Sequence, residues 1–193
     1  NRPIFKLDRL APANHIEHTN AHDAMADVRA TIGIARIIKD TQPKFFNYAL
    51  SLNDKKEVAQ LVKPLHPMLL TTSSFGYKSS FTRLVTSICN HPEYNDRSIV
   101  FNLNQDPEIF LELESEELKT LTFSRKSDLP RGIEKLDLSE LVYNKSPMFV
   151  CSPNSDNFKL SPILIEKFEL NLDKCLKNLR FIQKNSQSIE DKV

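Results

Sequence analysis

Two polar side chains near the start of the chain have the types and spacing of a hydrolytic site. His22 begins the sequence HDAMAD and Asp27 ends it. A carboxylate can ligate a divalent metal ion, and a histidine, whose pKa lies near neutrality, can take a proton from the attacking water. One carboxylate does not make a metal site, so further ligands must come from elsewhere. The alternative structural interpretation is a loop histidine beside an aspartate that complements a helix dipole.

An apolar helix is expected to follow this pair and to position it. Apolar side chains recur at helical spacing and predict a helix over residues 23–39, with a core-facing stripe made of Val28, Ile32, Ala35 and Ile38. Side chains five positions apart on one helix point about 140° away from each other. The pair can therefore serve one site only if the helix begins between its members, with Asp23 as the N-cap. A cap at Thr19 or Asn20 would start the helix earlier and separate them.

The segment IEHTNAHDAMADVRAT, residues 16–31, resembles the third exonuclease motif of the bacterial exodeoxyribonuclease I family, a group of DEDDh-class 3′→5′ exonucleases. In that motif the matching histidine is the general base and the matching aspartate is a metal ligand, which implies these roles for His22 and Asp27. The similarity continues in order through SSFG, HPE, SIVFNL, NKSP and CLKNLRFI, and so covers most of the chain. The resemblance also implies Mg²⁺ as cofactor, in a two-metal site.

The chain departs from that family at its beginning. The family's first motif, an Asp-x-Glu on an early strand, should lie far upstream of His22. Asp106-Pro107-Glu108 has this pattern but lies downstream, and its central proline does not suit an interior strand. We therefore expect an internal fragment. Residues 1–42 would be the C-terminal remnant of an RNase H-like exonuclease domain and residues 43–193 the next domain, because Pro43 disfavours continuation of the preceding helix.

Composition limits the classes of protein to which the chain can belong. The 193 residues are 40% hydrophobic and carry a net charge of +1, so a core can form but no global field attracts nucleic acid. Three glycines are too few for Gly-rich phosphate loops, and three widely spaced cysteines argue against a disulfide framework. The cysteines fit a reducing cytoplasm, and no apolar run approaches the length of a membrane span.

Beyond residue 42 the pattern is a mixed α/β (α+β) arrangement of short strands framed by helices. Helices are expected to begin at Pro43, near Asn53 or Asp54, and after Ser161 and Asn171. Residues Ile4–Leu7 alternate like a strand stub or a packing segment, and the polar tail after Asn185 is expected to be frayed. Strands are predicted at residues 67–72, 83–89, 98–103, 141–143 and 148–151. Periodicity does not separate a small barrel from an open sheet. The resemblance implies an SH3-like β-barrel domain with helical additions.

Aromatic and basic side chains alternate around Gly76, as a stacking surface for single strands requires; they are Phe75, Tyr77, Lys78, Phe81 and Arg83. Core aromatics in a mobile loop are an equally good explanation. Lys44 and Tyr48 could face the same groove. A basic face at Lys174, Lys177, Arg180 and Lys184 is typical of a solvated helix, and could also bind phosphates or an acidic peptide. The resemblance implies docking of the acidic C-terminal tail of single-stranded DNA-binding protein, with no residues assigned.

The function that these observations favour is part of a Mg²⁺-dependent exodeoxyribonuclease. The resemblance implies a monomeric enzyme without membrane attachment that degrades single-stranded DNA 3′→5′ to 5′-mononucleotides in DNA repair and recombination. The fragment alone is expected to be inactive. The alternative from another class is a non-catalytic module that binds single-stranded DNA or a partner protein. A His-Asp-type phosphohydrolase built on His15, His18, His22 and Asp23 is disfavoured, because His66 and His91 lie in proline-rich turns.

Overall fold

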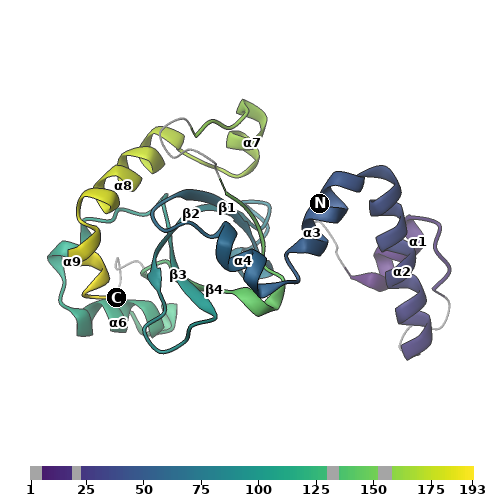
Figure 1. Ribbon diagram of the computed structural model, residues 1–193, viewed down its shortest axis with the longest axis horizontal. Coiled ribbons are helices and arrows are strands. Elements are labelled where there is room, and N and C mark those ends of the chain that lie inside the picture. Colours follow the sequence, from purple (N-terminus) through teal and green to yellow (C-terminus); the bar gives the residue numbers. More distant parts are fainter. Residues whose placement is uncertain (1–5, 19–22, 130–134, 152–157) are drawn as a thin grey trace. The chain divides into compact units, whose positions relative to one another are not determined.

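The computed structural model describes residues 6–18, 23–129, 135–151 and 158–193. The chain divides into two compact units, residues 1–52 and 53–193. Figure 1 labels their helices and strands. The sequence-based boundary at Gln42 and this division after Leu52 differ by one helix, α3, which packs with α2 in the first unit.

Three helices make up the described part of the first unit: α1 (Leu7–Ala13), α2 (Ala24–Thr41) and α3 (Pro43–Ser51). Helix α2 begins directly after Asp23, as predicted, and Pro43 occupies the first turn of α3, where its missing N–H costs nothing. The predicted strand stub is wrong at Leu7, which begins α1. The predicted side-chain cap is also wrong, because Asp23 accepts the N–H of Asp27 through its backbone carbonyl, at 3.0 Å, and its carboxylate makes no capping bond.

The segment after α1 turns sharply and lies against α2. His15 has a left-handed backbone (φ 58°), and the N–H of Ile16 donates to the carbonyl of Ala11 at 2.9 Å. The Ile16 side chain then packs on Gly33 of α2, where a Cβ atom would lie only 3.0 Å from the Ile16 Cδ1. Glycine at this position therefore permits the close approach, and Ala30 on the same helix is fully buried.

The apolar face of α2 is only half covered. Met25, Val28 and Ile32 are 55%, 49% and 45% exposed. The prediction that Val28 and Ile32 face a core is wrong for this chain, whereas the prediction that the core beside α2 is incomplete is confirmed. An apolar helical face of this kind needs a partner surface to remove it from water.

The second unit is built on one antiparallel sheet. Among the described residues the sheet has five strands in the order β4-β3-β2-β1-β5. The strands are β1 (Pro67–Thr71), β2 (Thr82–Asn90), β3 (Arg97–Asn102), β4 (Leu138–Val142) and β5 (Met148–Cys151). The mixed fold class is confirmed, but the expected barrel is not formed, because β4 and β5 are edge strands that pair only with β3 and β1 in the described part of the sheet.

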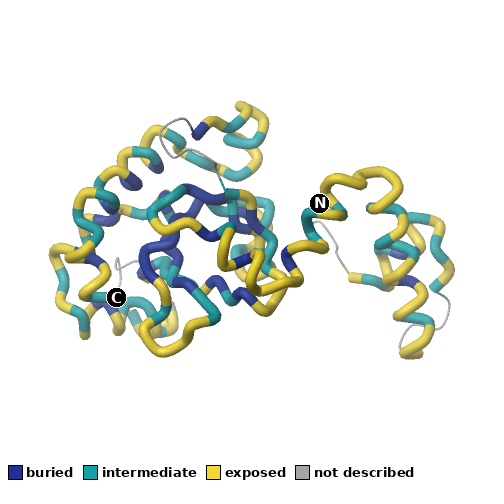
Figure 2. The backbone as a smooth tube through the Cα atoms, in the orientation of Figure 1, coloured by how far each residue is buried: buried dark blue, intermediate teal, exposed yellow. Residues whose placement is uncertain are grey.

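Helices complete the core of this unit. They are α4 (Lys55–Leu61), α5 (Ile109–Glu112), α6 (Ser115–Phe123), α7 (Pro162–Lys167), α8 (Leu172–Lys184) and α9 (Ser186–Glu190). Side chains of α5, α6, α8 and α9 form one cluster with Leu84, Ile88 and Phe101 of the sheet. Consecutive residues of β2 are buried from Leu84 to Cys89, so this central strand is covered on both faces. Figure 2 shows the buried residues concentrated along the strands.

Local signals place several of these helices as predicted. The Asp54 carboxylate accepts the N–H of Lys56 at 2.8 Å, and the Asn171 side chain accepts the N–H of Lys174 at 3.0 Å. The expectation of a frayed tail is wrong, because α9 follows Asn185 and places Ile189, fully buried, in the core cluster. None of the described helices has the length and hydropathy that crossing a membrane requires.

Candidate functional site

Asp27 lies in the first turn of α2, and its side chain is 46% exposed. Its predicted partner, His22, lies outside the described residues. The pairing of these two side chains therefore stays a prediction. The geometric condition for this pairing is that the helix begins between the two positions. Helix α2 meets it, because it begins at Ala24 with Asp23 as its N-cap.

The side chain that contacts Asp27 in the structure is His18. The His18 Nε2 lies 2.7 Å from the Asp27 Oδ1, and only 2% of the His18 side chain is exposed. An ionised carboxylate can only accept, so Nε2 carries the hydrogen and donates it. Sequence reasoning considered His18 only as a ligand of a different enzyme class. The signal that could have found it is a second histidine four residues before His22, in the loop that leads into the helix.

Asp27 fits the role of one metal ligand. Carboxylate oxygen is the donor that Mg²⁺ prefers, and the half-exposed side chain leaves the group accessible. In the described ranges no cluster of three or more His, Cys, Asp or Glu side chains could hold a metal ion. A complete metal site therefore needs carboxylates beyond those the structure describes.

A second group of candidate residues lies on the connection between β1 and β2. The 3₁₀ turn Ser73–Phe75 ends at Gly76, which has φ 73° and ψ 167°, a conformation open only to glycine. The N–H of Phe81 donates to the Gly76 carbonyl at 2.9 Å and closes the loop. The loop holds Phe75 in three adjoining surface hollows of the second unit.

Arg83 lines two of these hollows, and its charge is already paired. Its guanidinium donates to the Asp137 carboxylate and lies over the Phe75 ring, 4.4 Å from the centroid. Asn102 donates to the same Asp137 oxygen at 2.7 Å, and Gln105 accepts the N–H of Asp137 at 2.7 Å. The cluster forms a fixed floor with one aromatic face and several amide groups, which suits stacked bases and their polar edges.

The remaining candidate residues are placed as follows. Tyr77 is 45% exposed and lines a hollow together with the exposed Lys78 and with Arg83, so the structure brings these three together. Lys44 is exposed on α3, and Tyr48 is half-buried on the same helix, in the first unit. The basic residues of α8, Lys174, Lys177, Arg180 and Lys184, are all exposed along that helix.

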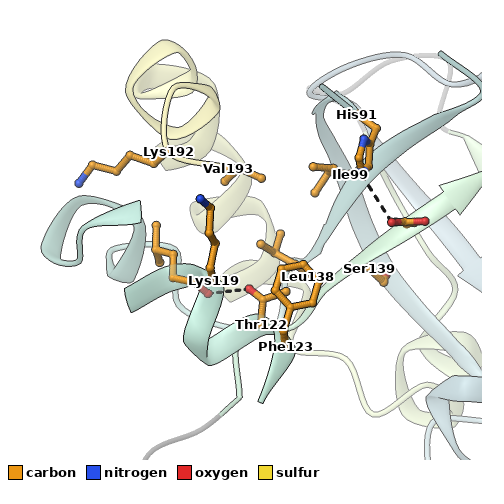
Figure 3. A pocket seen from close by; sticks show the side chains of 11 residues that line it. His91, Ile99, Lys119, Thr122, Phe123, Leu138, Ser139, Lys192 and Val193 are labelled. Carbon is orange, nitrogen blue, oxygen red and sulfur yellow. Dashed lines mark hydrogen bonds and ion pairs between the residues drawn. The ribbon is translucent and has the colours of Figure 1, made fainter. Parts of the chain in front are cut away.

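A separate, largely apolar pocket lies between α6, the sheet and the last residues (Figure 3). Phe123 stands at its edge and is 80% exposed, and Lys119 and Lys192 flank the pocket. Glu140 is held there by Arg97, whose Nη1 donates at 2.7 Å. Hydrogen bonds from Arg97 to Asp96 and to Glu140 raise the pKa of its guanidinium.

Comparison with known proteins connects nearly the whole chain to one family. The chain is 34% identical over 194 residues to the Escherichia coli (strain K12) protein named exodeoxyribonuclease I, covering 99% of this chain and 39% of that protein. The structure of E. coli exonuclease I with a dA16 oligonucleotide matches with TM-score 0.89 and 33% identity, over 100% of this chain and 40% of that one. A zinc-bound complex of the E. coli enzyme with single-stranded DNA matches with TM-score 0.86 and 33% identity, over 97% and 40%.

This chain spans about 40% of the length of the structures that it matches. The family model described as "Exonuclease I SH3-like domain" matches residues 53–193, which is the second compact unit. The open five-stranded sheet with its helical cover is thus the form that this domain takes here. The chain belongs to the exonuclease I SH3-like domain family.

Proposed function

We propose that the chain is part of an exodeoxyribonuclease that degrades single-stranded DNA 3′→5′, releases 5′-mononucleotides and serves DNA repair and recombination. The observation that carries the proposal is the match of nearly the whole chain to exonuclease I in complex with single-stranded DNA, at 33% identity and TM-score 0.86. The match to exonuclease I with a dA16 oligonucleotide covers 100% of this chain and so includes the segment with His22 and Asp27, which means that the proposal does not rest on the SH3-like domain alone.

In this function His22 is the general base and Asp27 is one ligand of a Mg²⁺ site. Metal ions in such a site lower the pKa of water and stabilise charge on the leaving oxygen. Asp27 contributes an accessible carboxylate at the start of α2, and His22 accepts the proton of the attacking water. The absence of a metal-holding cluster from the described ranges supports the further proposal that this chain by itself binds DNA without cleaving it.

The DNA-binding residues proposed in the second unit are Tyr77, Lys78 and Arg83. Phe75 and Tyr77 offer aromatic faces, and Lys78 offers an exposed charge to the backbone. Lys44 and Tyr48 are proposed to bind the same strand from the first unit. Because the net charge is only +1, the affinity must depend on local contacts rather than on a global field.

The remaining parts of the proposal concern the setting of the enzyme. Its partner is the C-terminal tail of single-stranded DNA-binding protein, and the basic face of α8 and the apolar pocket beside Phe123 both have chemistry that suits an acidic, apolar peptide. The enzyme is a monomer in the cytoplasm, where the free, buried thiols of Cys89 and Cys175 stay reduced.

The test uses the full-length exonuclease that contains this chain, with a labelled single strand as substrate. His22→Ala is expected to lower turnover about 10²–10⁴-fold, as the loss of a general base does. Asp27→Ala is expected to abolish activity at low Mg²⁺ concentration. His15→Asn, an exposed histidine in the same loop, is the matched control. Near-normal turnover in both site variants contradicts the assignment, and so does cleavage by residues 1–193 alone.

A further inference from the structure

The hydrogen bond between His18 and Asp27 joins a buried ring to a carboxylate that is half-exposed. The Nε2–Oδ1 distance of 2.7 Å is that of a strong, charge-assisted bond. The other ring nitrogen, Nδ1, is buried and has no hydrogen-bond partner within the described ranges. Within the described residues, the His18 ring therefore makes its hydrogen bond through Nε2, to Asp27.

The backbone before His18 explains why the ring reaches Asp27. The left-handed His15 turns the chain out of α1, and Ile16 fits against Gly33, about two and a half turns from the start of α2. From Ile16 the segment continues toward the start of α2, where His18 meets the first-turn Asp27. The ring is thus fixed by packing at 2% exposure as well as by its hydrogen bond.

We propose that His18 is a positioning residue, whose Nε2–H holds the Asp27 carboxylate in the orientation in which it binds the divalent metal ion. The inference rests on the proposed function, because it takes Asp27 as a metal ligand. A bond from a buried donor fixes one carboxylate oxygen and limits rotation of the group, so less entropy is lost when the metal binds. His18 does not touch the substrate and is distinct from the proposed base, His22.

The test measures metal binding as well as activity, in the full-length exonuclease. His18→Leu replaces the ring with an apolar side chain and so removes the hydrogen-bond donor. His18→Gln supplies an amide N–H donor close to the position of Nε2. For His18→Leu we expect Mn²⁺ binding to the DNA-free protein, followed by calorimetry, to weaken about 10–100-fold. The Mg²⁺ concentration for half-maximal activity should rise with it, while KM for DNA at saturating Mg²⁺ stays unchanged. His18→Gln should restore most of the affinity.

Two controls separate this inference from the function on which it rests. Wild-type protein must bind Mn²⁺ and cleave single strands, and Asp27→Ala must weaken Mn²⁺ binding; if either fails, the proposed function is wrong. If both controls succeed, the result for the His18 variants tests the positioning role by itself. Equal Mn²⁺ affinity in wild type and His18→Leu overturns the positioning role, and so does equal weakening by His18→Leu and His18→Gln, which would indicate a structural histidine. In the Asp27→Ala background His18→Leu should have no further effect on Mn²⁺ binding.

Discussion

Arg83 and Lys78 lie in the same hollow, but their charges differ in availability. Arg83 is neutralised by Asp137 and covered by Phe75, and its side chain is 28% exposed. Lys78 is exposed on the loop between β1 and β2. A basic residue that already has a carboxylate partner must exchange that partner to bind a phosphate, so only the exposed one adds a full counterion-releasing contact.

The salt dependence of DNA binding tests this difference. Lys78→Ala is expected to reduce the slope of log K against log salt concentration by about 0.7, the value for one phosphate contact on a single strand. Arg83→Ala is expected to change the slope less. It should weaken binding because the Phe75 ring loses the guanidinium that packs against it. A fluorescence anisotropy titration of residues 53–193 at several salt concentrations measures both. Equal changes in slope for the two variants would contradict the role assigned to the Asp137 pair.

The buried thiols give the protein a defined response to alkaline pH. Burial, with a smaller contribution from Glu190, raises the pKa of Cys89 to about 11, and burial likewise raises the pKa of Cys175 to about 11. The unfolded chain releases these protons near pH 9.0, whereas the folded protein keeps them. The unfolded state is therefore favoured progressively between these values.

We expect the free energy of unfolding to be unaffected by these thiols below about pH 9 and to fall as pH rises toward about 11. Urea denaturation at a series of pH values measures this. The double variant Cys89→Ala, Cys175→Ala should show a flatter decline over the same interval, because it lacks both thiols and is otherwise identical. Parallel curves for the two proteins would show that the thiols do not contribute.

At the scale of elements, one side chain on α8 ties that helix to the end of β3. The Asn178 amide is buried and donates to the carbonyls of Leu103 and Gln105, at 2.9 and 2.7 Å. These two carbonyls belong to the segment that carries Asn104, which lines the hollow beside Phe75. Helix α8 therefore helps to hold in place a segment that lines the proposed DNA-binding groove.

Asn178→Leu is expected to lower the free energy of unfolding by about 1–3 kcal/mol, because it leaves buried carbonyls without donors. Lys177→Ala, on the adjacent exposed position, should change stability by less than about 0.5 kcal/mol. Urea denaturation of residues 53–193 compares the two variants with the unmodified domain. If Asn178→Leu is as stable as wild type, the amide does not anchor this segment.

At the scale of the whole molecule, the two units differ in how completely each can bury its apolar residues. Residues 53–193 contain the sheet and the core cluster built on it. Residues 1–52 leave Met25, Val28 and Ile32 about half exposed, and Ala11, Ala30 and Leu52 are the hydrophobic residues classed as buried in their described part. A unit that buries so little apolar area gains little stability from the hydrophobic effect.

We therefore expect residues 53–193 to fold alone, with a single cooperative urea transition and an m-value of about 1–3 kcal/mol/M. In residues 1–193 the amides of α2 should exchange with deuterium faster than those of β2, because the first unit opens more easily. Hydrogen-exchange mass spectrometry compares them. In the full-length exonuclease the α2 amides should be protected, and equal exchange there and in residues 1–193 would show that its apolar face stays uncovered.

The elements that the sequence alone predicted are those with local causes. Pro43 starts α3, and Asp54 and Asn171 cap the helices that follow them, because a cap bonds backbone groups only a few residues away. Strand-like runs of residues likewise predicted β1, β2 and β3 within one or two residues of their bounds. The motif at residues 16–31 by itself indicates the exonuclease I family.

The choice of partners was decided only by the tertiary structure. Arg83 and Asp137 are 54 positions apart, and nothing in the sequence around either indicates the other. The sheet stays open because β4 and β5 lie at its two edges, which depends on how distant strands pair. Helix α9 is held by Ile189, which packs in a core formed by residues far away in the sequence. The pairing of Asp27 with His18 depends on the turn at His15 and on the space above Gly33. Such contacts join segments by packing, which local propensity and spacing do not encode.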